Sequence, residues 1–206
     1  MEEMQYCDWA LKNEAEKKYH DEEWGIPVHD DRVLFEFLVL EYMQAGLSWD
    51  TILSKRENMS KAFDQFNPLI IANYSESKIE ELMQNKGIIR NKLKLKALPV
   101  NAKIFLEIQR EFGSFSNYLW RYVDDKPIIN QWKKSEDVPS NTKLSDIISK
   151  DLKRRGFKFV GTTVIYAFLQ AAGVVNDHLI YCHKHKNSAI SASCLLYTSP
   201  SPRDTR

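Results

Sequence analysis

The segment from Leu34 to Trp49, LFEFLVLEYMQAGLSW, constrains the fold more than any other part of the chain. Read as a helix, it carries apolar side chains nearly all round, which is typical of a helix buried inside a protein. The chain can supply the surrounding core, because 43% of its 206 residues are hydrophobic. We therefore expect one domain, or two closely packed lobes, with this helix inside.

Glu41 is the exception within this segment. At helical spacing it shares a stripe with Leu34, Leu38 and Ala45, so its carboxylate should face inward. A buried carboxylate without a partner costs roughly several kcal/mol or takes up a proton. Two alternatives follow: a neighbouring Arg or backbone donors satisfy Glu41 in a structural role, or Glu41 belongs to a functional site.

Helical patterns continue over most of the chain. It contains seven glycines and no sustained alternation of apolar and polar residues, so we predict an all-α fold. Gly or Pro ends the helical runs, and the longest predicted loop extends from Asp124 to Thr142. The predicted helices cover Glu14–Glu23, Arg32–Ala45, Trp49–Lys55, Met59–Phe63, Pro68–Ala72, Glu76–Asn85, Lys92–Phe112, Phe115–Tyr122, Lys143–Arg155 and Thr162–Ala172.

Composition excludes several classes of protein. No run reaches the roughly 18 to 20 uncharged apolar residues of a membrane span, and the start MEEMQYCDW lacks the basic and apolar regions of a signal peptide. We therefore expect a cytoplasmic, intracellular protein with no membrane partner. The net charge of +1 conceals basic runs around Lys92 and Arg154, which are either solvated helix faces or phosphate contacts.

The end of the chain differs from the rest. After Asn187 it is rich in Ser and has no helical period. Its stretch CLLYTSPSPRD resembles the translation of a sequencing-library adapter, so we interpret residues 188–206 as a non-native or disordered tail and residues 1–187 as the functional domain. Cys194 is therefore left out of the chemistry.

Four residues near the two chain ends have spacings that suit a metal: Cys7, His20, His178 and Cys182. The last two lie four positions apart, on one face of a helix, and the first two would complete the four ligands of a tetrahedral Zn²⁺. His183 and His185 are competing ligands. Because four protein ligands leave no position for water, we predict one structural zinc ion that clasps segment 7–20 to segment 178–182.

The run RRGFKFVGTT connects a basic helix to the following helix through Gly156 and Gly161. It is either an ordinary joint between two helices or a seat for one phosphate at a helix N-terminus. Gly161 is followed by Thr162 and Thr163 where a Walker A loop requires Lys, so nucleoside triphosphate binding is not supported. The neighbouring basic residues, Lys158 among them, favour the DNA backbone.

Aromatic residues accompany these motifs. Trp9 and Tyr19 lie beside the first two proposed metal ligands, and Trp49 follows Glu41 by eight positions. They are either core residues or the walls of a pocket that holds a flat base, whose edge Glu41 could bind. Spacing alone is compatible with both.

Together these motifs resemble the 3-methyladenine DNA glycosylase I family, which belongs to the helix-hairpin-helix DNA glycosylases. The matching blocks, all in the family's order, are Cys7-Asp8-Trp9, Tyr19-His20-Asp21 with Trp24-Gly25, Leu40 to Trp49, Gly87-Ile88-Ile89-Arg90, KRRGFKFVGTT from Lys153 and VNDHLIYC from Val175. The resemblance covers roughly residues 4 to 186. The chain departs from the family pattern around Gln131 to Ser135.

The resemblance implies a helix-hairpin-helix unit around residues 143–172, a zinc-stapled lobe formed by the two terminal segments, and removal of 3-methyladenine from double-stranded alkylated DNA. It assigns Glu41 as the catalytic residue and Tyr19, Trp49 and Trp9 to the base. Free 3-methyladenine is the expected product, and a monomer the expected state. The expected DNA contacts are Gly46, Leu47, Lys158, Val160, Gly161 and Thr162, with Leu47 as an apolar wedge.

Two further expectations follow from the resemblance. Some related enzymes carry a nucleophilic lysine where this chain has Thr163, so we expect direct hydrolysis that leaves an uncut abasic site. Other relatives use an aspartate beyond the hairpin, and here Asp177 either has that role or, as we predict, caps a helix or orients a metal ligand. The alternative function is a non-catalytic, zinc-stapled helical DNA-binding protein.

Overall fold

The computed structural model describes residues 4–185, so the predicted tail at 188–206 lies outside the described residues. Most of the described chain is helical, as predicted. The longer elements are α1 (Glu14–Glu22), α2 (Asp31–Gln44), α3 (Trp49–Ala62), α4 (Pro68–Ile71), α5 (Glu76–Gln84), α6 (Lys92–Phe112), α7 (Phe115–Trp120), α8 (Lys143–Arg155) and α9 (Thr162–Ala171). The short ones are the 3₁₀ turns η1 (Asp8–Leu11), η2 (Asp64–Phe66), η3 (Arg121–Val123) and η4 (Ser135–Asp137), and the strands β1 (Ile128–Ile129) and β2 (Val175–Asn176).

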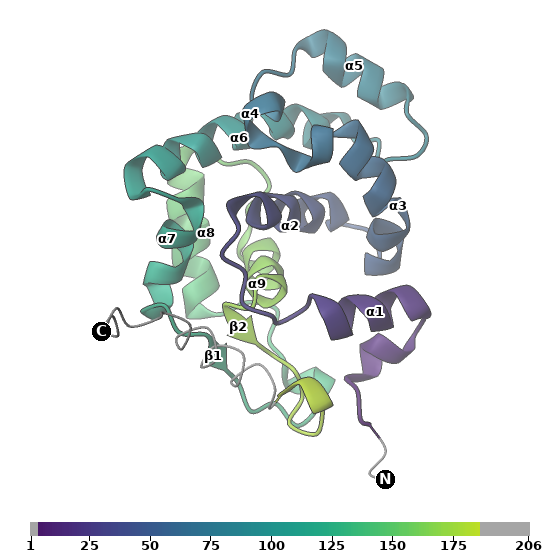
Figure 1. The fold of residues 1–206 in the computed structure, drawn as a ribbon, viewed down its shortest axis with the longest axis vertical. Helices are drawn as coiled ribbons and strands as arrows, with labels where there is room; N and C mark the ends of the chain where they lie inside the picture. Colours follow the sequence, from purple (N-terminus) through teal and green to yellow (C-terminus); the bar gives the residue numbers. More distant parts are fainter. Residues whose placement is uncertain (1–3, 186–206) are drawn as a thin grey trace, which may run out of the picture.

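Helix α2 lies at the centre of the molecule, with α3 and α6 on one side and α9 on the other (Figure 1). Every residue from Phe37 to Met43 is buried, which confirms the prediction of an internal helix. The helix begins where the Asp30 carboxylate accepts hydrogen bonds from the backbone N–H groups of Arg32 and Val33. It ends just before Gly46, whose φ of +85° lies in the left-handed region that favours glycine.

Two predictions of local structure were incomplete. The predicted helices Trp49–Lys55 and Met59–Phe63 form one continuous helix, α3, because neither Gly nor Pro lies between them. The predicted loop Asp124–Thr142 contains β1, which pairs in parallel with β2. Strands of two residues are too short to produce an alternating sequence pattern.

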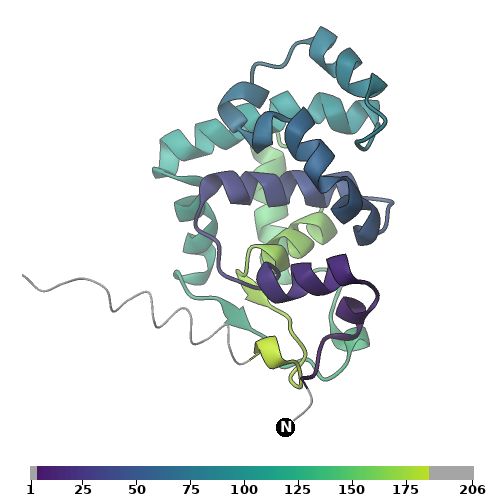
Figure 2. The same cartoon turned by 45° about the vertical axis from the view of Figure 1, so that its right-hand side comes forward.

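The two ends of the described chain meet in one lobe. Figures 1 and 2 both show the purple N-terminal segment beside the yellow-green segment that follows β2. The backbone N–H of His183 donates to the carbonyl of Gln5 at 3.0 Å, and the Tyr181 hydroxyl donates to Asp8 at 3.1 Å. We call this part, formed by segments 4–25 and 175–185, the terminal lobe.

Helices α8 and α9 have the bounds that the sequence predicted, apart from one residue at the end of α9. Gly156, at φ +103°, ends α8, and the chain turns back to Gly161, which precedes α9. We call residues 156–161 the hairpin. Within residues 4–185, no helix is long and apolar enough to cross a membrane.

Candidate functional site

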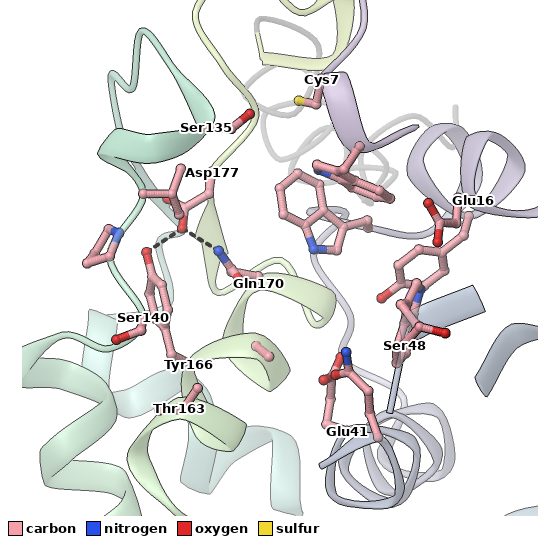
Figure 3. A pocket seen from close by; sticks show the side chains of 18 of the residues that line it. Cys7, Glu16, Glu41, Ser48, Ser135, Ser140, Thr163, Tyr166, Gln170 and Asp177 are labelled. Atoms are coloured by element: carbon pink, nitrogen blue, oxygen red, sulfur yellow. Dashed lines mark hydrogen bonds between the residues drawn. The ribbon is translucent and has the colours of Figure 1, made fainter. Parts of the chain in front are cut away.

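A pocket of about 620 Å³ opens between the terminal lobe and helices α2, α3 and α9 (Figure 3). The four residues that the sequence assigned to a pocket all line it: Trp9, Tyr19, Glu41 and Trp49. They come from four different elements, η1, α1, α2 and α3. Residues that are up to 40 positions apart in the sequence are therefore brought to one cavity.

Glu41 enters this pocket from the α2 side (Figure 3) and is only 6% exposed. Within the described chain it has no hydrogen-bond donor and no cationic partner. Arg56, which lies on the adjacent helix α3, binds Glu23 at 2.8 Å and Glu36 at 2.7 Å instead. The structural alternative, in which an Arg or the backbone satisfies Glu41, is therefore wrong. Burial raises the pKa of Glu41 to about 8.

The raised pKa of Glu41 makes stability depend on pH. In the unfolded chain this carboxyl has its ordinary pKa of 4.5, so between pH 4.5 and about 8 the folded state holds the extra proton. Its contribution to stability is therefore complete below pH 4.5 and is lost as the pH rises through about 8. Urea titrations across this window should show a falling free energy of unfolding in the parent and a smaller fall in Glu41→Gln. Equal slopes for the two proteins would contradict the assignment.

Two more polar groups in the pocket lack partners. The Tyr19 hydroxyl and the Trp49 Nε1 are buried and make no hydrogen bond within residues 4–185. The two rings lie against each other, with centroids 5.0 Å apart. Burial, followed by the nearby charge of Glu41, raises the pKa of Tyr19, so its hydroxyl stays protonated and can donate. A flat ligand with donors and acceptors on its edges would satisfy all three groups.

A second cluster lies behind this pocket, in the terminal lobe. The four predicted ligands are all buried, and their ligand atoms lie within 4.8 Å of one another: Cys7, His20, His178 and Cys182. The separations that define it are 3.1 Å between the two imidazole nitrogens, and 3.4, 3.6 and 3.7 Å between a nitrogen and a sulfur. A tetrahedral zinc site would give about 3.4 Å between nitrogens and about 3.6 Å between nitrogen and sulfur. The residues fit a metal ion.

The surroundings of the cluster fix the ligand orientations. The second ring nitrogen of His20 lies 2.9 Å from the Asp21 carboxylate, and that of His178 lies 3.1 Å from the Trp24 carbonyl. Such contacts select the ring nitrogen that would face a metal. Hydrogen bonds from Cys7 and from the two histidines hold the pKa of Cys182 well below its usual range, which favours the thiolate.

The competing ligands lie elsewhere. His183 contacts the Gln5 carbonyl at 2.9 Å, and His185 contacts the Asn130 carbonyl at 2.9 Å. Neither belongs to the cluster of four. His20 and His178, rather than His183 and His185, are therefore the histidines placed to bind a metal.

Asp177 does not have the role that the sequence suggested. Asn176, not Asp177, caps the backbone N–H of His178. The Asp177 carboxylate accepts hydrogen bonds from four side chains: Asn130, Trp132, Tyr166 and Gln170. Two of these four, Tyr166 and Gln170, line the pocket from α9 (Figure 3). The sequence analysis did not predict either residue, because their partner Asp177 lies outside α9, after β2, and no sequence spacing connects the three. Asp177 thus supports the pocket wall that Tyr166 and Gln170 form.

The hairpin is held in place from two sides. Asn101 of α6 pairs with both backbone groups of Lys158, and the Ser149 hydroxyl donates to the Val160 carbonyl at 2.6 Å. The Val160 side chain is buried, and the half-buried Thr162 donates a hydrogen bond from its hydroxyl to Asp146. At Val160, a DNA contact could therefore come only from the backbone.

The charged groups near the hairpin also separate into two kinds. Arg154 and Arg155 form ion pairs with Asp151, and Arg155 also binds Glu111, so the structure uses them internally. The Lys158 side chain is exposed and has no carboxylate partner in the described part of the chain. No described atom lies within 4 Å of a Cβ built at Gly161, so an external group can approach the start of α9 closely.

The turn after α2, residues Gln44 to Leu47, projects from the rim of the pocket. Gln44 lines the pocket, and the predicted wedge Leu47 is 42% exposed. No atom of residues 4–185, apart from the neighbouring residues in the chain, lies within 4 Å of the position that a Cβ at Gly46 would occupy, in agreement with a turn that faces outward. We call residues 44–47 the wedge turn.

This fold and site define a class of protein. A hairpin between two helices beside an aromatic pocket that contains an unpaired carboxylate is the construction of a helix-hairpin-helix DNA glycosylase. The chain belongs to the methyladenine glycosylase family, whose sequence model matches residues 9–185.

Individual relatives are similar along most of their length. The DNA-3-methyladenine glycosylase 1 of Escherichia coli (strain K12) is 44% identical over 179 residues, which are 87% of this chain and 96% of the relative. The DNA-3-methyladenine glycosylase of Haemophilus influenzae (strain ATCC 51907) is 45% identical over 176 residues, 85% of this chain and 95% of the relative. A structure that describes 3-methyladenine recognition by the Staphylococcus aureus enzyme superposes with a TM-score of 0.85 at 38% identity, covering 88% of this chain and 97% of that one.

Proposed function

We propose that this protein is a DNA repair glycosylase that rotates 3-methyladenine out of alkylated duplex DNA and hydrolyses its N-glycosidic bond. The observation that carries the proposal is Glu41, a buried carboxylate without a partner in an aromatic pocket. Three carboxylates line this pocket, but Glu16 has Lys12 at 3.6 Å and Asp177 has four donors. Among the carboxylates that the structure describes in this pocket, only Glu41 is free to bind a ligand.

Glu41 suits a cationic base. Methylation at N3 gives adenine a positive charge while it is attached to the sugar, and the base leaves as a neutral molecule. An ionised Glu41 can accept hydrogen bonds from the exocyclic amine and attract the cation, although its raised pKa means that the ligand must favour ionisation. Trp49 offers a stacking face, and the ring of Tyr19 lies next to both Trp49 and Trp9. Selectivity then arises mainly from binding.

Two surfaces would contact the duplex. The wedge turn, with Gly46 and Leu47, would fill the space left by the rotated base. The hairpin would hold a backbone phosphate with the N–H groups at the start of α9 and with the free charge of Lys158, while Gly161 lets the phosphate approach. A protein that only bound DNA would gain nothing from three unsatisfied polar groups in a pocket, which disfavours the non-catalytic alternative.

For the metal we infer one zinc ion. Two thiolates and two imidazoles are the donor set that Zn²⁺ prefers in closed tetrahedral sites. Such an ion would join the two chain ends and supply no open position for water. We further propose that the protein acts as a monomer inside the cell, where its DNA substrate lies.

The absence of an amine nucleophile gives the test of this function. Thr163 lines the pocket where some glycosylases carry lysine, so base loss should leave an abasic site in an uncut strand. A labelled duplex with one 3-methyladenine should stay intact after incubation with the protein and break only after hot alkali. Strand breakage without alkali, or none after it, would contradict the proposal.

A further inference from the structure

Helix α6 carries two buried polar side chains on one face. Lys94 is 6% exposed and Asn101 is 1% exposed. They lie seven positions apart, which places them two turns, or about 10 Å, from each other along the helix axis. A buried polar side chain needs a specific partner, so the contacts of these two residues show what this face of α6 holds.

Lys94 holds the wedge turn. Its ammonium donates to the carbonyl of Met43 at 2.9 Å and to that of Ala45 at 2.6 Å, at the C-terminal end of α2. A cation at this end of a helix satisfies carbonyls that have no partner within the helix. Lys94 forms no ion pair within residues 4–185, so its interaction with this turn is not shared with a carboxylate.

Asn101 holds the hairpin. Its Nδ2 donates to the Lys158 carbonyl at 3.1 Å, and its Oδ1 accepts from the Lys158 backbone N–H at 2.8 Å. Both backbone groups of one hairpin residue are therefore bound by a single side chain. Neither Lys94 nor Asn101 lines the pocket.

We propose that Lys94 and Asn101 are positioning residues that set the separation between the wedge turn and the hairpin, so that both contact one DNA duplex together. The inference rests on the proposed function, which assigns DNA contacts to both turns. Both side chains bind backbone atoms, so they determine the positions of the two turns and not which side chains the turns expose. A rigid separation matters because two contacts reinforce each other only when one geometry satisfies both.

The test is a double-mutant cycle with Lys94→Met and Asn101→Ala, measured by DNA affinity, free-base affinity and thermal unfolding. Each single variant should bind duplex DNA about tenfold more weakly and bind free 3-methyladenine as the parent does. Because the two residues lie about 10 Å apart and share no partner, their losses of stability should add. The fold loss of DNA affinity in the double variant should be smaller than the product of the two single losses. Either change alone already allows the distance between the wedge turn and the hairpin to vary.

Lys96→Met is the matched control, because Lys96 lies on α6 but forms an exposed ion pair with Glu76 at 2.7 Å. It should leave DNA affinity within about twofold. If Lys94→Met does not fold, Lys94→Gln, which removes the charge but keeps a donor, takes its place and should show a smaller loss of DNA affinity in the same direction. Losses of DNA affinity that multiply, or a parallel loss of free-base affinity, would overturn the inference but leave the function intact. A parent protein that bound neither methylated DNA nor the free base would overturn both.

Discussion

Replacing Glu41 by Gln should weaken binding of 3-methyladenine by roughly 5- to 150-fold while the protein stays folded. This range corresponds to about 1 to 3 kcal/mol for a lost hydrogen bond to a charged group. Gln keeps the shape of the side chain, but its amide donates where the exocyclic amine of the base also donates. The fold should survive because Glu41 has no partner within residues 4–185 that would be left unpaired. Titration of free 3-methyladenine, together with a thermal melt, measures both effects.

Glu36→Gln is the matched control for this experiment. Glu36 lies on the same helix α2, but it binds Arg56 at 2.7 Å and does not line the pocket. This variant should lose some stability and keep its affinity for the base. The pocket assignment is wrong if Glu41→Gln behaves in the same way, with unchanged base affinity and a lower melting temperature.

Replacing Cys182 by Ala should cause the largest loss of stability. A structural zinc site contributes about 10 to 16 kcal/mol of apparent binding free energy, which is comparable to the whole stability of a domain. Here the four ligands join the two ends of the described chain, so their loss frees the terminal lobe that carries Trp9 and Tyr19. We expect metal content to fall from one zinc per chain to near zero and the melting temperature to fall by roughly 10 °C or more.

Metal analysis of purified protein and a thermal melt of both proteins test this expectation. Cys194→Ala is the matched control, because it removes the cysteine that lies outside the described residues. It should leave both the metal content and the melting temperature unchanged. A parent protein without bound metal, combined with an unchanged melting temperature for Cys182→Ala, would rule out a structural metal site.

The sequence predicted most helices because their signals are local. Asp30 and Ser48 cap α2 and α3 where the pattern places helix starts, and Gly156 ends α8. The cluster of Cys7, His20, His178 and Cys182 was also predicted correctly, but the expected helix that would carry His178 and Cys182 on one face was wrong: this segment is irregular chain and turn after β2. The error in α3 arose where no Gly or Pro separated two helical runs.

Other features depend on contacts that sequence spacing does not record. Asp177 received a helix-capping role from its position before His178, yet its partners are Asn130, Trp132, Tyr166 and Gln170. Lys94 sits in a basic run that suggests a solvated face, but α2 packs against α6 and buries it. Whether Glu41 is satisfied depends on where Arg56 points, and only the packed structure decides that.

A pocket built around Glu41 should select 3-methyladenine for removal from DNA. The most direct test is to incubate the protein with duplex DNA that contains both 3-methyladenine and 7-methylguanine, and to identify the free bases by chromatography and mass spectrometry. We expect 3-methyladenine to be released and 7-methylguanine to stay in the DNA. Release of no base, or release of both at similar rates, would contradict this expectation.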